Sequence, residues 1–153
     1  MKSSLVRPAA AIVAAALLAA CNGGNTTSTY PTPGPNCVLP STFTMMYPEN
    51  NSTAPANTTE VYIASQNSTL ANGSYQTVWV PPDTNTALQG GYFTKVPLSA
   101  VPTPRATPGF SNPVYYESSI GPLSTGSTYQ IYFNNVNSST NCTPTLIDTF
   151  TTQ

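Results

Sequence analysis

The stretch Tyr129–Phe133, YQIYF, decides the fold that this sequence predicts. Large aromatic or aliphatic side chains occupy every second position, which is the period of a β-strand with one face buried. Because successive side chains of a strand point to opposite sides, Tyr132 is predicted to face outward with its even-numbered neighbours. The side chains predicted to face the interior are Tyr129, Ile131 and Phe133.

Six more short runs rich in β-branched and aromatic residues surround this stretch, and turn-forming residues separate them. No apolar pattern of helical period persists for three turns. Seven short strands in about 115 residues predict a single all-β domain, a β-sandwich. Within it, the segment QGGY, Gln89–Tyr92, is interpreted as a hairpin turn. The seven predicted strands are Phe43–Tyr47, Glu60–Ser65, Tyr75–Val80, Gly91–Val96, Val114–Ile120, Tyr129–Phe133 and Leu146–Thr152.

Two parts of the sequence resemble immunoglobulin-like and fibronectin type III-like domains. Residues 47–65, YPENNSTAPANTTEVYIAS, resemble the opening of bacterial immunoglobulin-like domains, where a turn joins the first two strands. Residues 120–133, IGPLSTGSTYQIYF, resemble the junction between the fifth and sixth strands of a fibronectin type III domain, where a leucine stands six residues before a tyrosine. The match implies that Leu123 and Tyr129 form a structural tyrosine corner, in which the Tyr129 hydroxyl returns to nearby backbone.

The sequence departs from this family pattern in two places. Residues 79–82, WVPP, resemble the end of a second fibronectin strand but follow a third predicted strand. Residues 84–112 are longer and richer in proline than the fold requires. The strand order in this region is therefore left open.

The first 20 residues have the organisation of a secretory signal peptide. Lys2 and Arg7 precede an apolar run, Ala9–Ala20, of about twelve residues, shorter than the roughly twenty that a membrane-spanning helix needs. The alternative, a buried helix of the domain, finds no partner of matching periodicity. The run ends in LAAC, residues 18–21, which resembles the lipobox of bacterial lipoproteins. The resemblance implies that Cys21 becomes the lipid-bearing first residue of the mature chain.

These features predict three regions: a signal peptide at 1–20, a flexible Pro-, Gly- and Thr-rich tether at 21–36, and the sandwich at 37–153. Several acyl chains on Cys21 would anchor the exported protein to the bacterial membrane stably. Asn22 stands where an aspartate would resemble the inner-membrane retention signal of enteric bacteria, so the outer membrane is favoured. Whether the domain lies on the periplasmic face or the surface face stays open.

Cys37 and Cys142 are the two cysteines that remain once Cys21 carries lipid. Export to an oxidising compartment favours a disulfide between them, which would close a loop of about 105 residues; two free thiols are the alternative. The resemblance to immunoglobulin-like domains agrees with this pairing. It implies that Cys37, before the first strand, and Cys142, in the loop between the last two, lie at the same pole.

Charge and residue content exclude several function classes. The predicted mature chain keeps two cations, Lys95 and Arg105, against five acidic residues, a net charge of −3 that offers no basic surface for nucleic acid. The sequence has no histidine, which removes Ser-His-Asp and Cys-His arrangements and the commonest metal ligand. The five carboxylates are scattered, and most of them are interpreted as surface groups. We therefore expect no enzyme activity, no catalytic residues, no metal site and no cofactor.

Two hypotheses for the function remain. The first is a lipid-anchored envelope protein whose non-enzymatic domain serves contact, adhesion or spacing, with an unknown protein or glycan partner. The second is a carbohydrate- or small-ligand-binding module displayed on the membrane. Tyr62, Tyr115 and Tyr132, which alternation places outward, could stack on sugars or form a protein-binding patch. The alternative is that tyrosine simply suits half-buried strands on a surface poor in charge.

Overall fold

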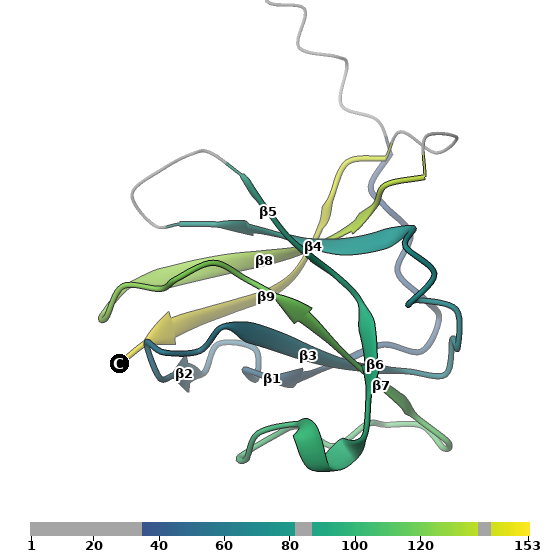
Figure 1. Cartoon of the computed structure of the whole chain (residues 1–153), viewed down its shortest axis with the longest axis horizontal. Helices are drawn as coiled ribbons and strands as arrows, with labels where there is room; N and C mark the ends of the chain where they lie inside the picture. The colour runs from purple at the N-terminus through teal and green to yellow at the C-terminus, as the bar shows by residue number, and fades with distance from the viewer. Residues whose placement is uncertain (1–34, 82–86, 138–141) are drawn as a thin grey trace, which may run out of the picture. The chain divides into compact units, whose positions relative to one another are not determined.

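Two β-sheets pack face to face in the computed structural model, which describes residues 35–81, 87–137 and 142–153 (Figure 1). One sheet has four strands in the order β1-β3-β7-β6, and the other has five in the order β2-β9-β8-β4-β5. Within the described ranges, no helix has the length and apolar character needed to cross a membrane. The elements are β1 (Thr44–Tyr47), β2 (Thr53–Ala54), β3 (Glu60–Ser65), β4 (Tyr75–Val80), β5 (Leu88–Tyr92), β6 (Thr94–Val96), the 3-10 turn η1 (Leu98–Ala100), β7 (Val114–Ser119), β8 (Thr128–Asn135) and β9 (Thr145–Thr152).

The predicted all-β sandwich is confirmed, but the predicted number of strands is wrong. The described residues form nine strands instead of seven. When β2 and β5 are set aside, the remaining strands follow the order A-B-E-D and G-F-C of an immunoglobulin-like sandwich. The prediction missed β2 because it has only two residues, which pair in parallel with the end of β9.

The predicted strand Gly91–Val96 is also wrong, because the chain changes sheets in its middle. β5 pairs with β4 in the five-stranded sheet, and β6 pairs with β7 in the four-stranded sheet. Phe93, between them, is buried in the core. The QGGY segment is therefore strand and not a hairpin turn. Its glycines allow close contact: a Cβ at Gly90 would collide with the Thr77 hydroxyl, and one at Gly91 would lie 2.9 Å from the Ser119 nitrogen.

A buried chain of hydrogen bonds joins the two sheets at this crossing. Thr77 on β4 and Ser118 on β7 share a hydrogen bond of 2.8 Å between their hydroxyls. The Ser118 hydroxyl also donates to the Gly91 carbonyl at 2.5 Å. Since both hydroxyls are buried, these bonds satisfy groups that would otherwise destabilise the core.

The main core lies between the sheets, and β8 supplies its centre. Tyr129, Ile131 and Phe133 are buried, as the alternation in YQIYF predicts, while Tyr132 is half-buried on the outward side. The Phe133 ring contacts three other rings at centroid distances of 5.4 to 6.2 Å. The partners of Phe133 are Phe43, Tyr75 and Phe93.

A second cluster of buried side chains lies on the outward side of the four-stranded sheet. Residues 97–113, which include η1, lie on the side of that sheet away from the five-stranded sheet (Figure 1). Val101 from this segment packs against side chains of β1 and β3. Tyr62 faces outward, as alternation predicts, but this cover leaves it only 8 % exposed, so it is not free on the surface to form a patch. The buried members of this outer cluster are Met46, Tyr62, Ala64 and Val101.

Candidate functional site

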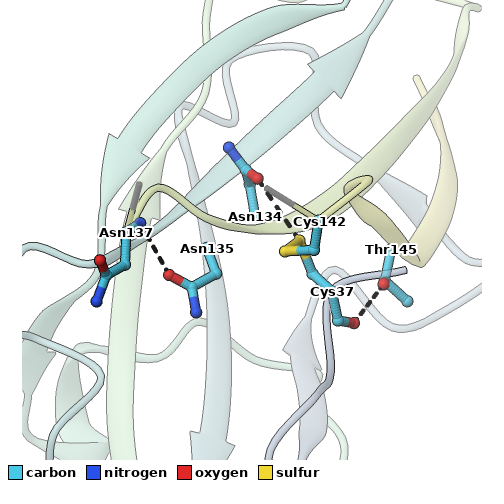
Figure 2. Close-up of a disulfide and its surroundings, with 6 residues drawn as sticks. All are labelled: Cys37, Asn134, Asn135, Asn137, Cys142 and Thr145. Atoms are coloured by element: carbon cyan, nitrogen blue, oxygen red, sulfur yellow. Dashed lines mark hydrogen bonds between the residues drawn. A yellow bond between two sulfur atoms is a disulfide. The ribbon is translucent and has the colours of Figure 1, made fainter. Parts of the chain in front are cut away.

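A disulfide fixes the point where the chain enters the sandwich (Figure 2). Cys37 and Cys142 are joined with an S–S distance of 2.03 Å, so the predicted pairing is present. The Cys37 nitrogen donates to the Thr143 carbonyl at 2.7 Å, and the Thr145 hydroxyl donates to the Cys37 carbonyl at 2.5 Å. Pairing begins earlier, because the Thr143 nitrogen donates to the Pro35 carbonyl at 2.9 Å. The entry point is therefore held covalently and by backbone pairing.

The predicted lipidation site, Cys21, lies outside the described residues, as do the signal peptide and most of the tether. Its acylation stays a prediction from the lipobox.

Tyr129 lies where the resemblance to fibronectin type III domains implies a corner. Its hydroxyl accepts a hydrogen bond of 2.7 Å from the Ser124 backbone nitrogen. Its ring lies 5.9 Å from the rings of both Trp79 and Phe150, and Leu123 packs against the same core. These contacts hold the turn before β8 against the core, so the role of Tyr129 is structural and not one of ligand binding.

Two hollows meet beside the end of β1, and we call them together the Tyr47 groove. The first has a volume of about 390 Å³, the second about 190 Å³, and Tyr47 and Pro55 line both. The first also has Glu49 and Pro104 in its wall, and the second has Glu60. The remaining lining residues are Ser52, Thr53, Thr103 and Gln153 in the first hollow and Asn57, Thr58, Thr59, Tyr62 and Pro102 in the second.

Three separate segments build this groove. The continuous stretch 47–62, from the end of β1 into β3, contributes two tyrosines, Pro55 and several hydroxyls; the covering segment 97–113 contributes residues 102–104; and Gln153 follows β9. The rings of Tyr47 and Tyr62 meet edge to face at 6.4 Å, and the Tyr47 hydroxyl lies 3.5 Å from that of Thr58. Sequence analysis missed this groove, because nothing local indicates that residues 102–104 lie beside Tyr47.

The electrostatic environment of the groove is acidic. Burial, and then the charges of Glu60 and Glu117, raise the pKa of the Tyr62 hydroxyl above its ordinary value. Glu60 accepts a hydrogen bond of 2.6 Å from the Thr59 hydroxyl. Among the lining residues, two carry a negative side-chain charge and none carries a positive one. The groove can therefore accept hydrogen bonds from a cationic group. No positively charged side chain lines the groove to compete for its carboxylates.

Asp148 is a second feature that sequence analysis missed. Its side chain on β9 faces the interior and is 1 % exposed, and neither carboxyl oxygen has a hydrogen-bond partner among the described residues. Burial raises the pKa of Asp148 to about 7. The neighbouring Thr149 backbone nitrogen lowers the pKa of Asp148 and so offsets part of this rise. The same nitrogen donates to Asn50 Oδ1 at 3.2 Å. Asp148 is therefore an exception to the interpretation that most carboxylates of this chain are surface groups.

The described part of the chain contains no group of three or more His, Cys, Asp or Glu residues that could hold a metal ion. Glu49 and Glu60 line different hollows of the same groove, whereas Asp148 lines neither. No family model, no curated protein and no solved structure matches this chain.

Proposed function

We propose that this protein is a lipid-anchored component of the bacterial envelope, with a non-enzymatic sandwich that serves contact, adhesion or spacing. The LAAC sequence at residues 18–21 supports the anchor. The observation that carries the proposal is the disulfide directly after the predicted tether. A domain held by an N-terminal lipid is pulled at its entry point, and here that point is Cys37, bonded to the far end of the chain at Cys142. The bond also suits an exported protein, since disulfides persist in oxidising compartments.

The experiment is mass spectrometry of the protein isolated from the membrane fraction of the cells that make it. We expect an N-terminal peptide beginning at Cys21 with acyl chains attached, and a Cys37–Cys142 cross-link under non-reducing conditions. Cys21→Ser should abolish acylation and detergent partitioning. The matched control, Cys37→Ser with Cys142→Ser, should remain acylated because its lipobox is intact. Unchanged detergent partitioning of Cys21→Ser would refute the proposed anchor.

A second candidate function, carbohydrate binding, is favoured by the open face of the five-stranded sheet. Of the side chains on these five strands, Asp148 alone is charged, and it is buried. Tyr92 on the edge strand β5 is 53 % exposed, and the Tyr132 hydroxyl donates to Gln130 Oε1 at 2.8 Å. Aromatic rings with amides and hydroxyls suit neutral sugars. A glycan array probed with the intact protein tests this candidate; Tyr92→Ala should abolish any signal.

A further inference from the structure

The Tyr47 groove concentrates negative charge that no cation of the described sandwich neutralises. Glu49 and Glu60 each line one hollow. Outside the groove, the described sandwich carries only two other acidic residues, Glu117 on β7 and the buried Asp148. The charge of the sandwich is thus unevenly placed, and half of its described carboxylates lie at one groove.

The two described cations lie elsewhere. Lys95 is on β6, in the sheet position next to β7, and lines neither hollow. Arg105 directly follows Pro104 in the sequence, but its guanidinium donates to the Leu98 and Val101 carbonyls at 3.0 and 2.5 Å. Those bonds hold residues 98–105 in a closed turn. Neither cation therefore competes with a ligand for the carboxylates of the groove.

We propose that the Tyr47 groove binds a cationic ligand with two ammonium or guanidinium groups on an extended chain. One positive group pairs with Glu49 in the larger hollow and the other with Glu60 in the smaller hollow. The aliphatic part between them lies across Tyr47 and Pro55, the two residues common to both hollows. Tyr47 and Tyr62 add cation–π attraction, since their ring faces carry partial negative charge.

Charge favours this ligand over a neutral sugar at the same place. Carboxylates attract ammonium and guanidinium groups over several ångströms and form charge-assisted hydrogen bonds with them. Prolines 55, 102 and 104 give the groove apolar walls that an alkyl chain can contact. The inference rests on the contact function proposed above and names its chemistry. The inference does not depend on the lipid anchor. Binding can therefore fail while the anchor is established, and the anchor can fail while binding is observed.

The experiment is isothermal titration calorimetry of the full chain in nonionic detergent. The probes are spermidine and a capped tetralysine peptide, with capped tetraglutamate and maltotriose as controls. We expect binding with one ligand per chain for at least one cationic probe, and at least about threefold weaker binding when salt rises from about 20 to about 150 mM. A response to the peptide alone identifies a basic protein segment as the source, and a response to spermidine alone identifies a small polyamine. Either response supports the shared chemistry.

Variants localise the binding to the groove. Glu49→Gln and Glu60→Gln should each weaken the affinity about fivefold, as expected for one exposed ion pair, and the double variant should lose about 25-fold. Glu117→Gln is the matched control. It removes the same charge from a residue that lines neither hollow but whose charge reaches Tyr62, so the affinity should fall by less than about twofold, well short of the loss in either groove variant.

The thermal unfolding midpoint of each variant shows that the chain is folded, so that lost binding reports on the groove. Three results overturn the proposal. The first is no binding of either cationic probe, and the second is equal binding by the double variant and the unaltered chain. The third is binding of maltotriose in preference to both cations, which would make the groove a sugar site.

Discussion

The two buried clusters of this sandwich differ in what creates them. The main core lies between the sheets and is lined by the inward side chains of both. The outer cluster has only four fully buried members and lies on the outward side of β1 and β3. It exists because residues 97–113, with Val101, cover that side. The same strands therefore bury both of their faces, and only one of these follows from strand alternation.

The outward side of the five-stranded sheet is buried only in part: Gln76 and Val78 on the inner strand β4 are buried. Leu146 on β9 is 47 % exposed, although it is as apolar as the residues of the outer cluster. Its cross-strand partner is Tyr132 on β8, which is half-buried. The comparison shows that apolar content alone does not decide burial on these outward faces. On the four-stranded sheet a covering segment from elsewhere in the chain contributes to this burial, and the same segment builds a wall of the Tyr47 groove.

The largest effect should come from truncating the main core. Phe133→Ala removes a ring that three other rings surround, and it should lower the free energy of unfolding by about 3–5 kcal/mol, as buried aromatic deletions do. Leu146→Ala, on the open outward side, is the control and should cost less than about 0.5 kcal/mol. Urea denaturation measures both values. A comparable loss for Leu146→Ala would mean that a partner or segment covers the five-stranded sheet as well.

The next effect concerns Asp148, the only charged residue among those the structure describes that is buried in the sandwich. Its folded-state pKa of about 7 is raised from 3.8, so between about pH 4 and pH 7 the folded chain keeps a proton that the unfolded chain has lost. Stability should therefore fall as pH rises through that window and level off above it, with a total loss of about 4 kcal/mol. The free energy of unfolding at about pH 4.5 and pH 8 should differ by about 3 kcal/mol of this total.

Asp148→Asn tests whether Asp148 causes this fall in stability with rising pH. The amide has nearly the same shape and no charge, so the contribution of this site to the pH dependence should disappear. At pH 8 the variant should be more stable than the unaltered chain, because it does not bury a carboxylate that the unfolded state solvates. A variant with the same pH profile as the unaltered chain would contradict the assignment.

The sequence predicted the main core well because a period of two is a local property. The inward positions of Tyr129, Ile131 and Phe133 were predicted without knowledge of other strands, and all three are buried. The disulfide was also predictable, since Cys37 and Cys142 are the remaining pair in a chain predicted to be exported and to carry lipid on Cys21. Both inferences depend on residue type and spacing alone.

The rest depended on contacts between distant segments. Alternation predicted the outward direction of Tyr62 correctly, but it could not predict that the side chain is buried there. Val101, which packs against it, lies about 40 positions away in the sequence. The chain passes from one sheet to the other at Phe93, between β5 and β6. The strand-forming residues of the predicted strand Gly91–Val96 do not indicate such a change. Predicting the Tyr47 groove would have required knowing that three separate segments of the chain come together. Asp148 was missed because aspartate in a strand is ordinarily at the surface.

A smaller effect tests the outer cluster directly. Val101→Ala should lower the free energy of unfolding by about 1–2 kcal/mol, since it removes buried methyl groups from a cluster with few members. Leu98→Ala lies in the same covering segment but at an exposed position, so it should cost less than about 0.5 kcal/mol. Chemical denaturation compares the two. Equal losses would mean that the whole segment, and not Val101, holds the cover in place.

The smallest effect distinguishes the two faces of β8 at a single atom. Tyr129→Phe removes only the hydroxyl that accepts from the Ser124 nitrogen at 2.7 Å, and it should lower the free energy of unfolding by about 1 kcal/mol. Tyr132→Phe removes a hydroxyl whose bond to Gln130 is exposed to solvent, so water can replace the partner and the loss should stay below about 0.3 kcal/mol. Urea denaturation with both variants in the same buffer resolves this difference. If Tyr132→Phe costs more, the Tyr129 hydroxyl does not hold the turn before β8, and the likeness of residues 120–133 to a tyrosine corner is accidental.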